Sequence, residues 1–480
     1  MNLALLITLM ITFLTFGCSL APKYERPAVQ TSAAYKEEKP VDTKDQWKTA
    51  RPKDEAIKGP WWQLFDDPDL DALEKKAAVS NQNIVSAAAL FLEARAMVKE
   101  ARSQYFPTLT VSPNVTRSRV GTPNALGAAG NTFTEYTLPF DASWEPDLWG
   151  RVRNTVNSKV FAAQGAAADL ENMRLSVQAE LAVDYYELRN QDALKPLLDA
   201  TVQSDSDTLK LMQVRYKAGL ESDQAVAMSE EQLKAAQVLD TNLGILRAQY
   251  EHAIAVLVGE PSSSFSIPAT VMKTTLPVIP VGLPSQLLER RPDIASAERA
   301  VAQANAQIGV ARTAYFPDLT LSAAAGFEAL SLADWFSWPS RFWAVGAGLS
   351  ETLFDAGLQR ATVAQYRAAY DQTVANYRQT VLSAFQQAED NLAALRILSQ
   401  SSQQQNEAVQ AAQRNLDEAT ARYKAGLDPY LNVLSAQVRL SDDQQTALNL
   451  HLQQLVASVQ LIKALGGGWE ASQLPPSKDM

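Results

Sequence analysis

Residues 101–113 read ARSQYFPTLTVSP, and 210 positions later residues 311–323 read ARTAYFPDLTLSA. Each copy begins with helix-forming residues, reaches Phe-Pro and then alternates Leu or Val with Thr or Ser. Proline disfavours a continuing helix, and a two-residue alternation is typical of a strand with one apolar face. Both copies therefore predict a helix that gives way to a β-strand, and the fold must contain this change twice.

The duplication extends through most of the chain. The segment QVRYKAGLES (213–222) matches TARYKAGLDP (420–429), and VLVGE (256–260) matches KALGG (463–467), both at an offset of 207. Before the first repeat lies a segment with several prolines and many charges but no helical or strand period, which predicts an extended tether. We therefore divide the chain into a signal peptide (1–17), a lipidated N-terminal tether (18–60), a first repeat (61–260), a linker (261–283), a second repeat (284–470) and a C-terminal tail (471–480).

Each repeat is predicted to contain two strands joined by a loop. The strands cover residues of about 106–118 and 132–146 in the first repeat and about 316–329 and 341–354 in the second. Along the first strand the two faces differ in polarity, with Leu109, Val111 and Val115 on one and Thr108, Thr110, Ser112 and Asn114 on the other. Aromatic residues fall near the strand ends and would suit a membrane interface: Tyr136, Trp144, Trp335, Trp338 and Trp343.

This alternation is compatible with two architectures. A soluble β-sandwich and a transmembrane β-barrel both use strands with one apolar face. Four strands cannot close a transmembrane barrel, because the smallest such barrels have eight. The strands are therefore either soluble or part of a barrel to which several chains contribute.

Long helices follow the strands in each repeat. From about 150 to 217 and from about 358 to 425, Ala, Leu, Gln, Arg and Glu continue for ~65 residues, which corresponds to a helix on the order of 100 Å. Helices of this length require a coiled-coil partner or a helical tube. Both end at a YKAG motif, where Gly219 and Gly426 are predicted to reverse the chain before a shorter returning helix.

Composition excludes several classes of function. The net charge of −10, without a cluster of Lys or Arg, argues against nucleic acid as a partner. Two His and one Cys leave almost nothing for soft-metal coordination or a nucleophilic dyad, so we expect no enzyme activity, no catalytic residue, no metal and no cofactor. The acids Asp66, Asp67, Asp69 and Asp71 lie where a helix is predicted to begin at Pro68, and we expect them to cap it rather than form a catalytic pair.

The single cysteine stands at the end of an apolar run. Residues 3–16 have the length of a signal peptide, and the run stops at Gly17-Cys18, with no Lys or Arg before it. This pattern is similar to a lipoprotein signal, in which Cys18 becomes the acylated N-terminus. The alternative is an ordinary cysteine beside an uncleaved anchor. Ser19 after the cysteine favours export to the bacterial outer membrane.

The motifs together resemble one family. WWQLFDDPDLDALEKKA (61–77), WEPDLWGRVR (144–153), GLPSQLLERRPDIASAE (282–298), ETLFDAGLQR (351–360) and RYKAGLDPYLNVLSAQ (422–437), together with the Cys18 signal and the duplicated YFP frame, resemble the outer-membrane efflux factors. These TolC-like proteins include a lipoprotein branch that contains OprM, and the resemblance covers about residues 18–470. It implies an α+β membrane protein: a homotrimer whose chains each contribute four strands to one transmembrane β-barrel, above a long α-helical barrel in the periplasm.

The resemblance also implies a function. Such proteins are exit ducts of tripartite efflux pumps, which pass drugs or other small solutes from an inner-membrane transporter and a periplasmic adaptor to the exterior. We expect a transporter of the resistance-nodulation-division type and contact with outer-membrane lipid. The alternative is a lipid-anchored coiled-coil scaffold of the periplasm that does not conduct. A periplasmic hydrolase is disfavoured because the sequence offers no nucleophile elbow, metal cluster or general base.

Site residues are carried over by matching positions. The two helix-reversal tips would contact the adaptor, through Arg215, Tyr216, Gly219 and Leu220 in the first repeat and Arg422, Tyr423, Gly426 and Leu427 in the second. The periplasmic aperture would lie on the following helix, with Leu431 as the apolar constriction. Ser435 stands where the family has an acid, and Val438 where it has a base. We therefore look for aperture charges nearer the tip, at Glu221, Asp223 and Asp428.

Overall fold

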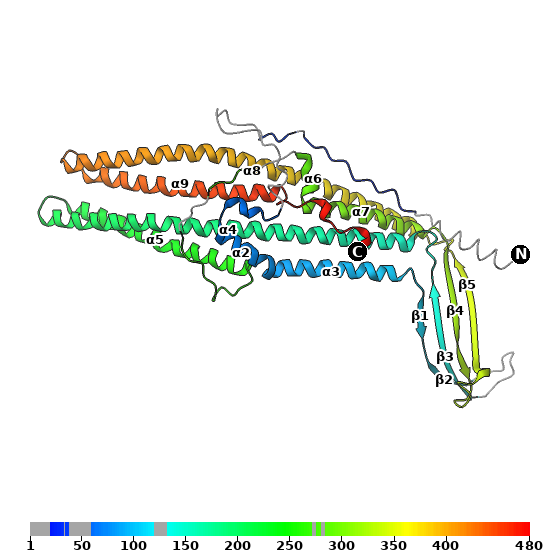
Figure 1. Cartoon of the computed structure of the whole chain (residues 1–480). Helices are drawn as coiled ribbons and strands as arrows, with labels where there is room; N and C mark the ends of the chain where they lie inside the picture. The colour runs from blue at the N-terminus through cyan, green and yellow to red at the C-terminus, as the bar shows by residue number, and fades with distance from the viewer. Residues whose placement is uncertain (1–19, 33, 38–58, 120–131, 271–274, 280–283) are drawn as a thin grey trace.

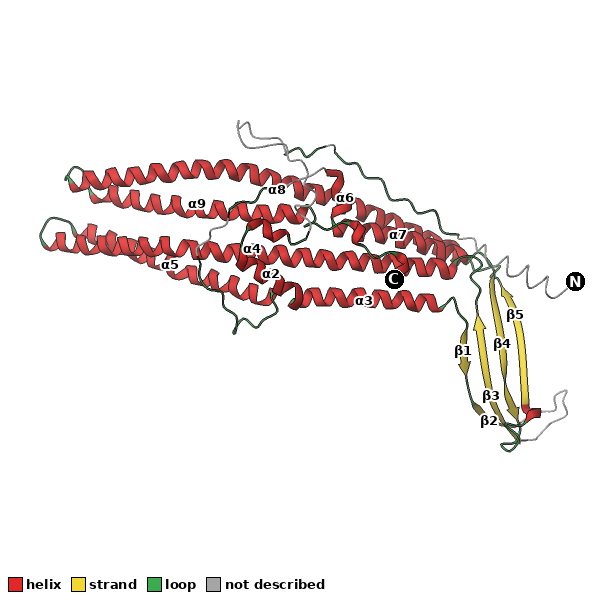
Figure 2. Ribbon diagram, in the orientation of Figure 1, coloured by secondary structure: helices red, strands yellow, loops and turns green. Residues whose placement is uncertain are grey.

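The protein is an elongated helical bundle that carries a β-sheet at one end (Figures 1 and 2). The computed structural model describes residues 20–32, 34–37, 59–119, 132–270, 275–279 and 284–480. The predicted signal peptide and Cys18 lie outside these residues. Within the described part of the chain, no helix combines the length and apolarity needed to cross a bilayer.

The predicted long helices are confirmed. Helices α4 (Arg151–Lys217) and α8 (Leu358–Lys424) each contain 67 residues, so each is about 100 Å long. Each returns as a 35-residue antiparallel helix, α5 (Asp223–Leu257) after α4 and α9 (Tyr430–Ala464) after α8. Pro196 lies inside α4 without ending it.

The shorter helices have the same symmetry. Helices α3 (Gln82–Ser103) and α7 (Pro292–Thr313) both contain 22 residues and lead into the sheet. Neighbouring contacts run from α3 to α4, from α4 to α7 and from α7 to α8, so these four helices form one layer on the sheet side of the molecule. Both entry helices end before the Phe-Pro pair, because a turn at residues 104–106 or 314–316 separates helix from strand.

The helix predicted at Pro68 begins there. Helix α2 (Pro68–Ser80) has Asp67 as its N-cap, whose carboxylate accepts hydrogen bonds from the backbone N–H groups of Asp69 and Leu70. Asp69 pairs with the buried Arg189 of α4 at 3.0 Å, and Asp71 accepts a bond from the indole N–H of Trp62. Asp67 is therefore the cap of this helix, whereas Asp69 and Asp71 lie in its first turn and have side-chain partners of their own.

A hydrophobic core near the middle of the bundle lies beside the N-terminus of α2. Trp61 and Phe65 of the 3-10 helix η1 (Trp61–Phe65) pack against Tyr185 and Tyr186 of α4, where their burial removes large apolar surfaces from water.

The LLERRPD motif closes the other half of the bundle. Short helices η2 (Pro284–Gln286) and α6 (Leu287–Arg290) precede Arg291, whose guanidinium donates to the carbonyl of Ala464 at 3.0 Å and forks onto Asp293 at 2.7–3.0 Å. Arg291 therefore ties the start of α7 to the end of α9.

The sheet is antiparallel and contains five strand segments in four positions. Strands β1 (Thr108–Val111) and β2 (Asn114–Arg119) both pair with β3 (Thr132–Trp144), which pairs with β4 (Asp318–Ala329), which pairs with β5 (Arg341–Ser350). The prediction of one unbroken strand at 106–118 was therefore wrong, and the strand predicted at 341–354 ends earlier, at Ser350.

The break between β1 and β2 does not shift the register. Val111 lies opposite Phe140 and Asn114 lies opposite Thr137, so the pairing continues in step across the gap. Pro113 has no N–H to donate and interrupts the ladder at this point. Measured from Thr108 to Arg119, the broken strand matches β4 at an offset of 210 residues, which agrees with the repeat in the sequence.

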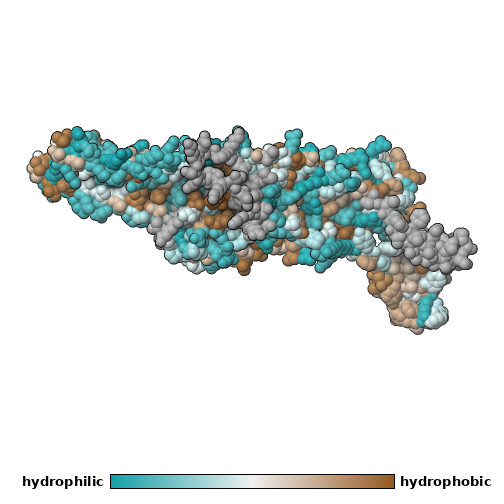
Figure 3. Space-filling model, turned by 45° about the horizontal axis from the view of Figure 1, so that its top comes forward, coloured by the Kyte–Doolittle hydropathy of each residue, from teal (hydrophilic) through white to brown (hydrophobic). Residues whose placement is uncertain are grey.

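The register places most of the large aliphatic residues of the four positions on one face. Leu109 lies opposite Ala142, Ala142 opposite Ala323 and Ala323 opposite Val345, so the apolar row crosses the whole sheet. The large side chains on this face are exposed in the single chain: Leu109 is 71% exposed and Val345 is 73% exposed. Figure 3 shows the sheet as a largely apolar surface below a mixed helical body. Among the described residues, the outer edges of β1/β2 and β5 have no strand partner.

Candidate functional site at the helical tips

Two helix-reversal loops lie together at the end of the molecule opposite the sheet (Figure 1). We call residues 215–223, between α4 and α5, the first tip, and residues 422–430, between α8 and α9, the second tip. Since the repeat offset is 207 residues, each position of one tip has an equivalent in the other.

Both tips use the same backbone geometry. Gly219 has φ +72° and Gly426 has φ +74°, the left-handed region in which glycine is favoured. The N–H of Leu220 donates to the carbonyl of Arg215 at 2.9 Å, and the N–H of Leu427 donates to Arg422 at 3.0 Å. These bonds form the Schellman ending of a helix, so the predicted role of the two glycines as turn residues is confirmed.

An ion pair spans each turn. The guanidinium of Arg215 lies 3.3 Å from the carboxylate of Glu221, and that of Arg422 contacts both oxygens of Asp428, at 2.6 and 3.2 Å. The bond from Arg422 lowers the pKa of Asp428, and the same bond raises the pKa of Arg422. Two of the three acids considered as aperture charges are thus balanced within their own tip, whereas Asp223 is exposed in the first turn of α5.

The two tips are joined by a contact that breaks the repeat symmetry. The hydroxyl of Tyr423 donates to Glu221 of the first tip at 3.1 Å, and Arg215 lies 5.3 Å from the centre of the Tyr423 ring. Burial is the main cause of the raised pKa of Tyr423, followed by its bond to Glu221. Its equivalent, Tyr216, is instead 47% exposed. Tyr216 and Tyr423 occupy the same position in the repeated RYKAGL motif. The local sequence therefore does not predict which of them contacts the other hairpin.

A small apolar cluster lies beneath the contact. Met212 of α4 is fully buried against Tyr430 and Val433 of α9, and the ring of Tyr423 packs edge-on against Tyr430 with centroids 5.4 Å apart. Sequence reasoning did not select Met212 or Tyr430. Their apolar character at helical spacing signals a core position, but it does not identify the helix they meet.

The outermost apolar side chains are bare. Leu220 is 67% exposed and Leu427 is 68% exposed, beside the exposed ring of Tyr216. Figure 3 shows apolar colour at this narrow end of the molecule, in contrast to the hydrophilic flank next to it. Exposed apolar groups at both tips form a surface suited to a protein partner.

The predicted aperture residues lie on the first turns of α9. Leu431 is 51% exposed, and Ser435, one turn later, is also exposed and bonds through its hydroxyl to the carbonyl of Leu431 at 2.8 Å. Val438 is half-buried, so it is less accessible than the other two. The face of α9 that bears Leu431 and Ser435 therefore offers an apolar side chain and a neutral hydroxyl, with no charge at either position.

Within the described residues, no group of three or more His, Cys, Asp or Glu side chains is arranged to hold a metal ion. The described residues form long helical hairpins, joined tips and a sheet with one apolar face and two open edges. These features define a class of protein in which long helical hairpins lead into a small antiparallel sheet at one end of the molecule.

The chain belongs to the outer membrane efflux protein family, whose sequence profile matches residues 73–260 and 283–467. The probable efflux pump outer membrane protein TtgC of Pseudomonas putida KT2440 is 31% identical over 474 residues, covering 97% of this chain and 96% of that protein. The pyoverdine export outer membrane protein OpmQ of Pseudomonas aeruginosa is 31% identical over 425 residues, covering 86% of this chain and 88% of that protein.

The fold has solved counterparts. The open-state crystal structure of the MtrE outer membrane channel of Neisseria gonorrhoeae matches with a TM-score of 0.82 and 25% identity, covering 95% of this chain and 99% of that one. Together with family membership, this likeness confirms the predicted fold class and the location in the outer membrane with an extension into the periplasm. The protein is a non-enzymatic efflux component, as the sequence predicted.

Proposed function

We propose that three copies of this chain form an outer-membrane channel that serves as the exit duct of a tripartite efflux pump. The observation that carries the proposal is the sheet, whose four strand positions share an apolar face and end in two unpaired edges among the described residues. Pairing the β5 edge of one chain with the β1/β2 edge of the next satisfies the backbone groups that lipid cannot. Three chains then supply twelve strands, enough to enclose a lumen.

The same arrangement accounts for the helices. Exposed apolar side chains on α3, such as Leu90 at 59% and Leu92 at 61%, are available for a neighbouring chain. A ring of α3, α4, α7 and α8 from three chains would continue the barrel into the periplasm for about 100 Å. A scaffold without conduction is not favoured, because a sheet with a bare apolar face has no role in it and the relatives are named as efflux pump outer membrane proteins.

The two tips are proposed to receive a periplasmic adaptor, which links the duct to an inner-membrane transporter of the resistance-nodulation-division type. Support comes from the exposed Leu220 and Leu427 and from the open space around Gly219 and Gly426, where an added Cβ would meet no atom within 4 Å. A partner backbone can approach such glycines closely. Small organic solutes are the proposed cargo, and the transporter supplies the energy.

The aperture is proposed to close at the level of Leu431 and Ser435 in the three copies of α9. Because residue 435 is a serine, a ring of acidic side chains at this position cannot close the aperture. The joint between Tyr423 and Glu221 is proposed to hold the two hairpins of each chain in the closed arrangement, because it is the hydrogen-bonded link between the tips. Asp223 would add negative charge near the entrance.

Cys18 is proposed to carry the lipid anchor, with residues 1–17 removed and residues 18–60 as the tether. The described part of the tether supports this course: the carbonyl of Pro22 accepts a bond from Asn305 of α7, and the backbone N–H of Lys36 donates to Glu389 of α8. Palmitate labelling of the wild type and its absence in Cys18→Ala is the expected result. Labelling that persists in the variant would contradict anchoring at this residue.

Measurements of oligomeric mass and of ion conductance together test the proposed trimeric channel. Full-length protein purified in detergent should have three times the chain mass by light scattering, and it should form ion-conducting pores in planar bilayers. Single cysteines on the outer edges of β1 and β5 should cross-link between chains, and cysteines at the paired central strands should not. A protein that is monomeric and soluble without detergent would contradict the proposed channel. A trimer that does not conduct ions would contradict it as well.

A further inference from the structure

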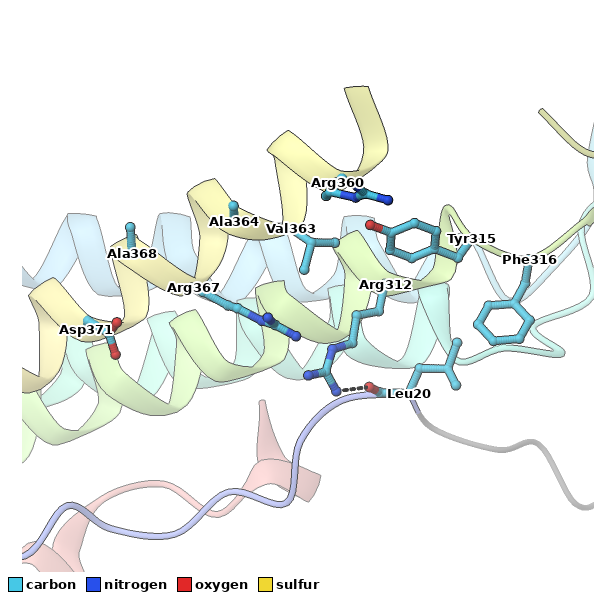
Figure 4. A pocket seen from close by; sticks show the side chains of 10 residues that line it. All are labelled: Leu20, Arg312, Tyr315, Phe316, Arg360, Val363, Ala364, Arg367, Ala368 and Asp371. Carbon is cyan, nitrogen blue, oxygen red and sulfur yellow. Dashed lines mark hydrogen bonds between the residues drawn. The ribbon is translucent and has the colours of Figure 1, made fainter. Parts of the chain in front are cut away.

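A pocket lies where the helical bundle meets the sheet, between the end of α7 and the start of α8. Its volume is about 670 Å³, and it is bordered on one side by Leu20 of the N-terminal segment. Figure 4 shows Arg312 extending from α7 and Arg367 extending from α8 into the same region, with Arg360 and Tyr315 nearer the sheet. Nothing in the proposed duct function uses this pocket.

The pocket has an excess of positive charge. Arg312, Arg360 and Arg367 line it, and Asp371 is the one acid among its lining residues. Within the described residues, the guanidinium of Arg312 donates one hydrogen bond, to the carbonyl of Leu20 at 3.3 Å, which leaves its other N–H groups there for a ligand. Both Arg360 and Arg367 are exposed, and no ion pair involves either of them in the described part of the chain. Three guanidinium groups around one cavity suit a phosphate, which accepts their paired N–H bonds.

The pocket lies at the level expected for the periplasmic surface of the membrane. Strand β4 begins at Asp318, two residues beyond Phe316 of the pocket rim, and Arg360 is in the first turn of α8. Phe316 stacks on Trp149 with ring centroids 4.9 Å apart, and Tyr315 adds a third ring. Aromatic side chains concentrate at the depth of lipid headgroups. Seven residues of helix separate Arg360 from Arg367, which is about 10 Å, comparable to the depth of the headgroup layer.

We propose that this pocket binds the phosphate headgroup of an anionic phospholipid in the membrane leaflet that faces the periplasm. The arginines hold the phosphate, and the small side chains Ala364 and Ala368 leave room for the glycerol part of the headgroup. The acyl chains would extend toward the apolar face of the sheet. The inference rests on the proposed insertion of the sheet in the membrane, and it predicts up to three such lipids in a trimer. Basic pockets at a membrane surface bind anionic lipids in this way.

The test is native mass spectrometry of the full-length protein in detergent, titrated separately with phosphatidylglycerol, phosphatidylcholine and inorganic phosphate. The test variant is Arg360→Gln/Arg367→Gln, and the control is Arg378→Gln/Arg414→Gln, which removes two exposed arginines from the same helix outside the pocket. We expect phosphatidylglycerol to bind the wild type and the control equally and to bind the test variant about tenfold more weakly. Phosphatidylcholine should bind all three proteins weakly.

Two results would overturn the proposal: equal retention of phosphatidylglycerol by the test variant and the control, or binding of inorganic phosphate without preference for the lipid. Bilayer conductance of the same samples separates this inference from the duct. A test variant that still conducts shows an intact channel, so a change in lipid binding then reports on the pocket. Wild-type protein that fails to conduct contradicts the duct instead.

Discussion

The hydroxyl of Tyr423 donates a hydrogen bond to Glu221, a residue 202 positions earlier in the chain, and thereby joins the two tips at 3.1 Å. Glu221 is also the partner of Arg215, whose guanidinium lies over the Tyr423 ring. Three residues from two hairpins therefore share one contact, and loss of any one of them loosens the joint between the tips.

Tyr423→Phe removes the hydroxyl and keeps the ring. The lost bond to a carboxylate is worth about 1.5 kcal/mol, so the ratio of open to closed channels should rise roughly tenfold. Single-channel recording in planar bilayers measures this ratio. Tyr216→Phe is the matched control, because the equivalent hydroxyl of the first tip has no hydrogen-bond partner within the described residues. Equal effects of the two variants would count against the joint.

Asp428→Asn should loosen the second tip alone. Arg422 lowers the pKa of Asp428 below its usual 3.8, so the pair stabilises the folded tip above that range and is lost only as the pH falls through the lowered value. From about pH 7 to about pH 5 the open fraction of the variant should therefore exceed that of the wild type by a constant factor. Asp223→Asn, which removes an exposed charge, should change cation selectivity instead. If the open fractions of the variant and the wild type already became equal near neutral pH, the ion pair would not be the cause of the difference.

Substitutions at Gly219 and Gly426 can show whether these glycines serve only the turn or also contact a partner protein. Alanine at either position costs about 1 kcal/mol in the left-handed region, whereas asparagine is tolerated there. If the tips contact the adaptor, both substitutions should weaken adaptor binding, because both add atoms to an open surface. Calorimetric titration of the purified protein with a candidate periplasmic adaptor measures the effect. Weakening by alanine but not by asparagine would assign these glycines to the turn alone.

The two faces of the sheet should respond differently to charge. Val345 and Ala344 are neighbours on β5 and point to opposite faces. An arginine on the lipid side of a barrel strand costs about 2–4 kcal/mol at the membrane midplane. Val345→Arg should therefore reduce the amount of trimer in the outer membrane fraction, and Ala344→Arg should leave it near the wild-type level. Similar losses from both variants would indicate that this face does not meet lipid.

Much of the fold could be predicted from the sequence, because its signals are local. The 67-residue helices follow from long uninterrupted runs of helix-forming residues that end at Gly219 and Gly426. The strands follow from a period of two, and the repeat from two copies of YFP and YKAG. The break at Pro113 was missed, although its cause, a missing N–H, is itself a local property.

The helices and strands, their order and the class of the protein could be predicted from local patterns, since helical runs, alternation and turn glycines act over a few residues. Which side chains meet depends on the packing of the whole chain. It placed Tyr423 rather than Tyr216 against the other hairpin, and it balanced Glu221 and Asp428 with arginines. It also aligned the apolar rows of four strands into one face. Such contacts join segments up to hundreds of residues apart, and they depend on how whole helices pack and strands pair rather than on any local pattern.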